Sequence, residues 1–303
     1  MTKLLTQIQA GILAAIPPHA NYLTFNLRAG ADAVTKIRQA LQALAPLIDG
    51  NKVVIGIGLG TVTALGKTVG NLRDFPVFPE AKVALPVNND AIWIWLRESQ
   101  RGDLVKQTQR VVDALSGAFA LSSCVDAFKF DSGRDLTGYV DGTENPHDQA
   151  AIDAAIVQQQ GPGQDGGSFV AVQQWLHRWD QFKAMSTAQQ DNAIGRRISD
   201  NEEMDDAPES AHVKRTAQES FQPEAFVLRR SMPWSQGARS GFYFVAFGKT
   251  LDAFEVQLKR MSGAEDGIVD GLFSFSQPQT GSYFWCPPMR DGVVDLSLIF
   301  ELK

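Results

Sequence analysis

A carboxylate between two glycines is the first feature of this sequence that could do chemistry. Asp141 stands in the stretch Gly138-Tyr139-Val140-Asp141-Gly142. Glycines permit tight turns and a close approach of the backbone to a bound planar group, and a carboxylate placed there can move a proton between ligand atoms. Taken alone, the stretch is more typical of a turn in which Asp141 bonds its own backbone.

Four histidines are available as nitrogen ligands for a metal: His19, His147, His177 and His212. His19 precedes an expected strand, and His147 opens an expected helix, where a capping or surface role is ordinary. His177 ends an apolar strand and could belong to the core or to the surface. Because a lone histidine is more often structural than a ligand, His212 is singled out only by the motifs that accompany it.

Several motifs of the chain together resemble the signature of dye-decolourising peroxidases, most closely their bacterial type B branch. They follow one another in the order found in that family and extend over most of the chain. The motifs are residues 138–146, 209–215 and 229–234, and a closing segment formed by residues 270–273 and 280–288.

The resemblance implies a peroxidase that holds haem b non-covalently, with one iron per chain. Such an enzyme reduces hydrogen peroxide through a high-valent iron-oxo intermediate and oxidises dyes, phenols or other organic donors. The alternative from a different class is a haem- or porphyrin-handling or iron-release protein with incidental peroxidase activity. Both functions require the iron ligand, but only peroxidase turnover requires the groups on the peroxide side.

On the proximal side, the resemblance makes His212 the iron ligand. A carboxylate on the other nitrogen of the imidazole would raise the basicity of the ring. By resemblance Asp270 is the candidate, and an acid in residues 200–209, which are nearer in the sequence, remains an alternative.

On the distal side, the resemblance assigns the proton transfer to Asp141 and charge stabilisation to Arg229, a permanently cationic, fork-shaped group. Ser231 would lie on the same strand face as Arg229, because side chains alternate with period two, and its hydroxyl could hold water or peroxide. Arg230 remains the alternative to Arg229. A carboxyl base also favours an acidic pH optimum.

Haem propionates require cations or backbone donors. Arg196 resembles the propionate-binding arginine of the family, although it could equally be a cation at the end of a helix. Glu144 and Asn145 are further candidates by their position in the motif, and Phe244 and Leu258 are candidate walls of the pocket.

The elements that must position these residues form two similar series. In the first half, the apolar patterns predict a strand over residues 21–29, a helix over 31–48, strands over 52–60 and 91–97, a helix over 103–119 and a strand over 121–130. In the second half they predict a strand over 168–175, a helix over 188–197, strands over 225–231 and 241–247, a helix over 251–261 and a final strand region.

This order predicts an α+β fold of two ferredoxin-like halves, with antiparallel sheets and helices packed outside. The expected domains are residues 1–130 and 131–303. By resemblance, the C-terminal half holds most of the haem.

The composition of the chain limits the classes of molecule that it is expected to bind. The chain has 303 residues and a net charge of −6, which does not favour nucleic acid or an anionic membrane as a partner. The apolar runs are too short for a membrane span, and no export signal is readable. Two cysteines, Cys124 and Cys286, point to a reducing cytoplasm and exclude covalent c-type haem. The family implies a homo-oligomer.

Overall fold

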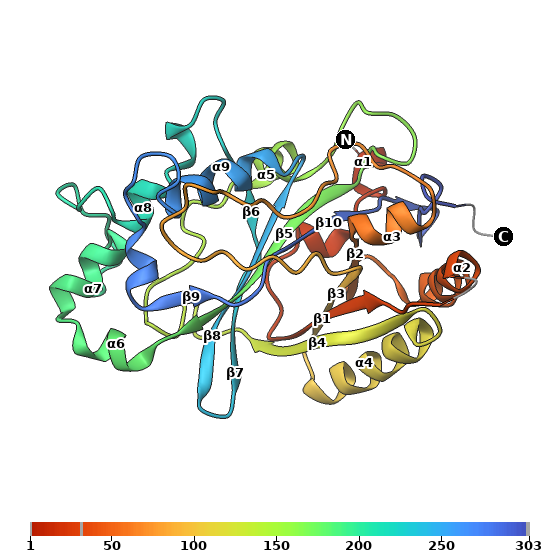
Figure 1. Cartoon of the computed structure of the whole chain (residues 1–303), viewed down its shortest axis with the longest axis horizontal. Helices are drawn as coiled ribbons and strands as arrows, with labels where there is room; N and C mark the ends of the chain where they lie inside the picture. The colour runs from red at the N-terminus through yellow and green to blue at the C-terminus, as the bar shows by residue number, and fades with distance from the viewer. Residues whose placement is uncertain (1, 31–32, 301–303) are drawn as a thin grey trace.

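The computed structural model describes residues 2–30 and 33–300 of the chain (Figure 1). Its strands are β1 (His19–Leu27), β2 (Val53–Ile57), β3 (Ile92–Glu98), β4 (Phe119–Phe128), β5 (Ser168–His177), β6 (Leu228–Arg229), β7 (Met232–Gln236), β8 (Arg239–Gly248), β9 (Ser276–Pro278), β10 (Ser282–Cys286), β11 (Met289–Arg290) and β12 (Val293–Val294). Its α-helices are α1 (Thr2–Leu5), α2 (Ala33–Leu44), α3 (Leu59–Ala64), α4 (Arg101–Leu115), α5 (Asp148–Ala155), α6 (Trp179–Ala184), α7 (Thr187–Ile194), α8 (His212–Arg215) and α9 (Asp252–Met261). Short 3₁₀ turns are η1 (Ala10–Ile12), η2 (Ala45–Leu47), η3 (Gln218–Ser220) and η4 (Gly271–Ser274). Across the described residues, no helix combines the length and the apolar character that a membrane crossing requires.

Two four-stranded antiparallel sheets form the centre of the molecule. The first has the strand order β4-β1-β3-β2, and the second has the order β10-β5-β8-β7, with β6 beside β8. Each order is that of a ferredoxin-like unit, so the predicted fold class is confirmed. In Figure 1 the first unit lies on the right with α2 and α4, and the second lies on the left with α6 to α9.

The two sheets join edge to edge at two narrow seams. At one seam β4 pairs with β7 through Ala127 and Trp234, and at the other β2 pairs with β10 through Ile57 and Trp285. Because β8 also pairs with β5, these pairings close the strands into a ring. Closure leaves few free strand edges, which are otherwise exposed to pairing with other chains.

Most predicted elements are present with shifted ends. α7 ends at Ile194, three residues before position 197, where the helix was expected to end, because Gly195 follows in a left-handed conformation (φ 93°). The expected strand over 225–231 is reduced to β6, because Gln218 bonds the backbone of Ala225 and Val227 in place of a strand partner. The start of the predicted helix at 31–32, residue 1 and residues 301–303 lie outside the described residues.

The inside of the ring is filled by large aromatic side chains from both sheets. Tyr22 stacks on Tyr243 with ring centroids 4.0 Å apart, and Trp93 contacts Phe284 and Phe247. All five of these side chains are almost fully buried. Because alternate residues of a strand face opposite sides, the neighbours of these aromatic residues face outward.

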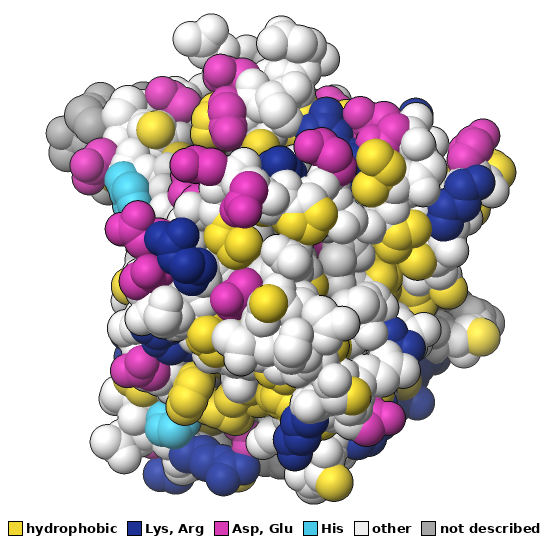
Figure 2. Space-filling model, turned by 90° about the vertical axis from the view of Figure 1, so that its left-hand side faces the viewer, with side chains coloured by type: hydrophobic (Ala, Val, Ile, Leu, Met, Phe, Trp, Pro, Cys, Tyr) yellow, Lys and Arg dark blue, Asp and Glu magenta, His cyan; other side chains and the backbone are white. Residues whose placement is uncertain are grey.

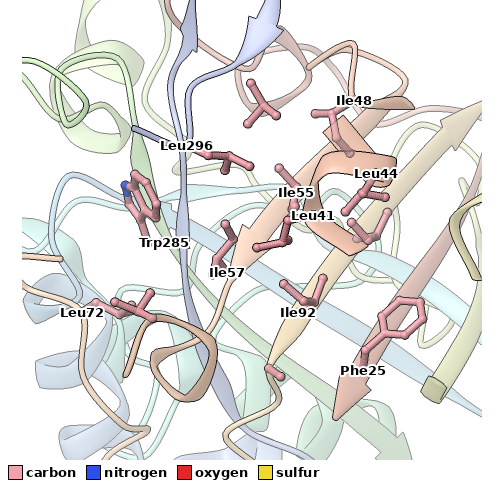
Figure 3. Close-up of a cluster of buried hydrophobic side chains, with 14 of the residues drawn as sticks. Phe25, Leu41, Leu44, Ile48, Ile55, Ile57, Leu72, Ile92, Trp285 and Leu296 are labelled. Atoms are coloured by element: carbon pink, nitrogen blue, oxygen red, sulfur yellow. The ribbon is translucent and has the colours of Figure 1, made fainter. Parts of the chain in front are cut away.

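The outer faces of the sheets form a second core under the helices. Figure 3 shows Leu41, Leu44 and Ile48 packed over Ile55 of β2. Trp285 of β10 joins the same cluster, so this core also crosses from one sheet to the other.

A long segment from the N-terminal half crosses the C-terminal half. We call residues 66–91 the strap; Figure 1 shows them in orange, running along α9 and turning back between α9 and β9 in this view. The ring of Phe75 lies between Phe254 of α9 and Tyr283 of β10. Arg73 forms ion pairs with Asp252 and Glu255, both on α9. The strap therefore fixes α9, which forms one wall of the cleft described next.

Candidate active site

A deep cleft lies on the outer face of the second sheet, under α7, α8 and α9. It encloses about 910 Å³ of empty space, part of which is open to solvent. Its floor consists of β5, β6 and β8, and its walls come from the loop 131–146, from α9 and from the segment that begins at His212. Figure 2 views the end of the molecule that carries α6 to α8 and shows acidic side chains there among exposed apolar ones.

His212 lines this cleft and pairs with Asp270. Nδ1 of His212 lies 2.8 Å from Oδ2 of Asp270, whose side chain is fully buried. The other carboxylate oxygen accepts the N–H of Leu272 at the start of η4, which fixes the carboxylate. Nε2 of His212 makes no hydrogen bond to the described residues and is the nitrogen left for a ligand in the cleft. The acidic loop 200–209 does not supply the partner of His212.

The backbone around His212 is held on several sides. The N–H of Gly271 donates to the carbonyl of Ser210, and Arg215 forms a two-point ion pair with Asp266. A Cβ on Gly271 would lie 2.5 Å from the carbonyl oxygen of Ala193, so only glycine permits η4 to approach α7 this closely. The position of His212 is therefore fixed by elements distant in sequence.

Asp141 and Arg229 both line the cleft. Asn145 joins their two segments, because its amide accepts the N–H of Arg229 (2.8 Å) and donates to the Arg229 carbonyl (3.1 Å). Nε of Arg229 is buried without a hydrogen-bond partner in the described part of the chain. Asn145 itself does not line the cleft, and it acts on the backbone of Arg229.

Arg230 points away from the cleft. Its guanidinium donates to the carbonyls of Ile12 and Leu13 in the N-terminal segment. Burial, with a smaller contribution from Arg97, lowers the pKa of Arg230 to about 10, so it stays charged at neutral pH. Of the two neighbouring arginines, the structure brings Arg229 to the cleft.

Ser231 is not brought to the cleft, contrary to the expectation from strand alternation. It is 4% exposed, does not line the cleft, and its Oγ accepts the N–H of Val245. The Arg230 N–H donates to the Val245 carbonyl, while the Arg230 carbonyl accepts the Tyr22 hydroxyl. The hydroxyl of Ser231 therefore supports the sheet.

Arg196 and Glu144 are paired with each other outside the cleft lining. NH2 of Arg196 lies 3.0 Å from a carboxylate oxygen of Glu144 and 3.0 Å from one of Glu203. Arg196 is buried, whereas the carboxylates of Glu144 and Glu203 are more than half exposed, and propionate binding by Arg196 stays a prediction. The pair ties the Asp141 loop to the segment that leads to His212.

A second histidine–aspartate pair in the cleft was not expected from the sequence. His177 is buried, with Nε2 3.0 Å from Asp135 and Nδ1 2.9 Å from Ser276. Burial raises the pKa of Asp135, but the charge of His177 and hydrogen bonds from His177 and Thr137 outweigh this and lower it overall. Since both ring nitrogens are engaged, His177 is unsuited to ligate a metal.

Tyr139 and Gln173 also line the cleft, although the sequence analysis did not name them as site residues. The Tyr139 hydroxyl donates to Asp191, and burial together with that carboxylate raises the pKa of Tyr139 well above its ordinary value. The signal for Gln173 and His177 was present in the sequence. Together with Trp175 they alternate along one strand and so share a face.

A family model described as "Dyp-type peroxidase, C-terminal" matches residues 132–291, which include every cleft-lining residue named above. This chain belongs to the Dyp-type peroxidase family. It is accordingly a peroxidase, and the peroxidase function is favoured over the alternative of haem handling or iron release.

Relatives with the same description match along almost the whole chain. The dye-decolorizing peroxidase of Rhodococcus erythropolis is 30% identical over 298 residues, covering 93% of this chain and 87% of its own. That of Mycobacterium tuberculosis is 27% identical and covers 91% and 87%.

Solved structures agree with the fold. A dye-decolorizing protein from V. cholerae superposes with a TM-score of 0.81 at 26% identity, covering 95% of this chain and 98% of its own. A variant of DypB from Rhodococcus jostii RHA1, solved in complex with heme, gives a TM-score of 0.80 at 26% identity and covers 91% and 94%.

Proposed function

We propose that this chain binds haem b in the cleft through His212 and reduces hydrogen peroxide with electrons from an organic donor. The observation that carries the proposal is the His212–Asp270 pair, which leaves Nε2 as the available nitrogen. A histidine that ligates iron donates its other ring N–H to a carboxylate in this way. The heme-bound state of DypB from Rhodococcus jostii supports the same cofactor here.

The other cleft residues fit such a group. Apolar side chains of β8 and α9, among them Phe244 and Leu258, offer flat walls. The unpartnered Nε of Arg229 supplies a buried donor with no acceptor in the described part of the chain. When bound, haem supplies a redox-active iron that takes up the oxidising equivalents of peroxide.

Residues of the chain supply proton transfer, charge stabilisation and positioning of the iron ligand. Asp141 takes a proton from the inner peroxide oxygen and returns it to the outer one, which becomes the leaving group. Arg229 stabilises the negative charge that develops on that oxygen. Asp270 keeps the Nδ1 proton of His212 in place and raises the basicity of the ring. Asn145 holds Arg229 in position through its backbone.

Haem loading and turnover test the proposal separately. We expect the His212→Ala protein to lose the Soret band that the wild type shows after reconstitution, whereas His147→Ala, at an exposed position outside the cleft, keeps it. Asp141→Asn and Arg229→Leu should keep the band and lose about 10²- to 10⁴-fold in peroxide turnover. A His212→Ala protein with an unchanged band would refute the ligand assignment.

We further infer that the chain acts in the cytoplasm as a homo-oligomer, with a boundary between its halves near residue 131. Both cysteines are free thiols, as is typical of a reducing compartment. The family-model match begins at residue 132, next to the end of β4. Sedimentation velocity would measure the oligomer, and a purely monomeric species at micromolar concentration would contradict it.

A further inference from the structure

Two arginines behind the cleft carry positive charges that no acid neutralises by direct contact. Arg97, in β3, is 7% exposed, and Arg230, directly after β6, is partly buried. Within residues 2–30 and 33–300 neither side chain forms an ion pair, and both donate to backbone carbonyl oxygens instead. Since buried arginines are normally paired with acids, two unpaired ones in one place need a functional explanation.

The two guanidinium groups lie close together because they hold the same short segment. Arg230 donates to the carbonyls of residues 12–13, and Arg97 donates to that of Ala15 at 2.6 Å. Arg97 also lies over the ring of Trp95, 4.7 Å from its centroid. A ring face stabilises a cation without cancelling its charge, so both positive charges persist at this place.

The surrounding acids offset these charges only in part. Asp49 acts on the pKa of Arg97 from a distance, while its own carboxylate accepts the backbone N–H groups of residues 51–53. The charge that acts on Arg230 is that of Arg97, and it lowers the pKa of Arg230 in the same direction as burial. With a pKa of about 10, Arg230 is still a cation at neutral pH.

The charge of Arg230 stays beside the strand that brings Arg229 to the cleft. The Arg230 side chain leaves the opposite side of the backbone but curls back, so that one terminal nitrogen lies 3.0 Å from the Arg229 carbonyl oxygen. Because neighbouring side chains take opposite faces, on the order of 10 Å separates this charge from a ligand next to the Arg229 guanidinium. A unit charge at that distance acts strongly when little water lies between.

The cleft itself offers little positive charge to a developing anion. Of the residues that line it, Asp135 and Asp141 are acidic, whereas Arg229 is the arginine. Cleavage of peroxide puts negative charge on the departing oxygen, close to the carboxyl group of Asp141. A positive field from behind the strand would lower the energy of that charge.

We propose that Arg97 and Arg230 form a fixed pair of positive charges behind Arg229. Their field stabilises the negative charge of the departing peroxide oxygen and raises the reduction potential of the iron. Neither residue lines the cleft, so they act at a distance. The proposal rests on the peroxidase function proposed above and adds two residues that support it electrostatically.

Charge-removing and charge-keeping variants of the haem-loaded full chain separate a field from a mere structural role. Arg230→Met and Arg97→Met remove one charge each, and Arg230→Lys keeps it. The matched control is Arg28→Met: Arg28 also donates to a carbonyl and forms no ion pair within the described residues, but it is exposed and follows the end of β1 opposite to Arg97. Spectroelectrochemical titration measures the potential, and stopped-flow spectroscopy measures the rate constant for peroxide.

We expect Arg230→Met to lower the rate constant for peroxide about three- to tenfold. The reduction potential should fall by at most about 59 mV, the one-electron equivalent of a tenfold factor. Arg97→Met should shift both quantities in the same direction by less, because Arg97 lies further from Arg229. Arg230→Lys and Arg28→Met should stay close to the wild type. Thermal unfolding verifies folding, and Arg230→Gln is the second variant if Arg230→Met is unstable.

An unchanged potential in folded Arg230→Met would overturn the proposal. So would an Arg230→Lys protein as impaired as Arg230→Met, because the bonds to residues 12–13 would then matter and the charge would not. A wild-type protein that shows no Soret band after reconstitution would instead refute the proposed function, and this proposal with it.

Discussion

The pairing of His212 with Asp270 explains why an imidazole at this position is suited to ligate iron. The carboxylate is fully buried and receives two fixed donors, the imidazole N–H and the N–H of Leu272. Burial keeps the interaction strong, because a low dielectric screens it less. Asp270 thus caps η4 and orients His212, and its two roles can be separated by substitution.

Replacing Asp270 with Asn keeps a hydrogen-bond acceptor for His212 but removes the negative charge. We expect the haem-iron reduction potential to rise, because the ring becomes less basic, and haem affinity to fall by about 10- to 100-fold. Spectroelectrochemical titration of the reconstituted protein measures the potential. An unchanged potential would show that the charge of Asp270 does not reach the ligand.

The buried pair of Asp135 and His177 makes a further prediction about acid stability. Because the pKa of Asp135 is lowered in the folded protein, the ionised carboxylate stabilises the fold above its ordinary pKa of about 3.9. That contribution is lost as the pH falls through the lowered folded-state value. We expect Asp135→Asn to melt at a lower temperature than wild type near pH 6, with the difference shrinking toward pH 3. A constant difference over this range would contradict the assignment.

At the scale of elements, the cleft depends on segments that do not themselves face a ligand. The strap crosses from the N-terminal half and contacts α9 through Arg73. The loop that carries Asp141 is held by bonds from Asn145 to Arg229 and from Arg196 to Glu144. Lys82 of the strap also donates its backbone N–H to the carbonyl of Ser262, just beyond the end of α9. The wall formed by α9 is thus fixed by a piece of the opposite half.

Phe75 provides the test of the strap. It is 2% exposed and lies between two aromatic rings, so Phe75→Ala should cost about 3–5 kcal/mol of unfolding free energy. Loosening of α9 should also speed haem loss to an acceptor protein such as apomyoglobin. Arg73→Ala breaks only ion pairs that are about one-third exposed on the arginine side and should cost about 1 kcal/mol or less. Equal effects of the two variants would argue against apolar packing as the main fixing force.

At the scale of the whole molecule, the two halves share their interior. Tyr22 and Trp93 from the first sheet pack directly on Tyr243, Phe247 and Phe284 from the second. The seams between the sheets contribute a single residue pair each, so the aromatic interior holds the ring together more than strand pairing does.

We therefore expect the full chain to unfold in one cooperative transition. Residues 131–303 expressed alone should lack fixed tertiary structure, because the aromatic face of the second sheet would be exposed to water. Calorimetry and near-ultraviolet circular dichroism of the two proteins measure this. A fragment with its own sharp transition would show that the halves are independent domains.

The order of elements and the identity of the site residues could be read from the sequence, since period-two and helical patterns survive in any packing. The pattern predicted most strands of the two sheets and the helices α2, α4, α5, α7 and α9, but not the short helices α1, α3, α6 and α8. The motifs named Asp141, His212, Arg229 and Asp270 as candidates. The family resemblance supplied their roles, and the fold shows that all but Asp270 line one cleft while Asp270 stands behind His212.

Only the tertiary structure shows which candidate residues reach the cleft, because their positions depend on contacts between residues far apart in the chain. The choice of Arg229 over Arg230 follows from the carbonyls of Ile12 and Leu13, which only folding brings near. Ser231 lies outside the cleft, where its hydroxyl accepts the N–H of Val245 from the neighbouring strand. Likewise, the nearness of Arg97 to Arg230 is evident only in the folded chain, because residues 12–15 hold both side chains.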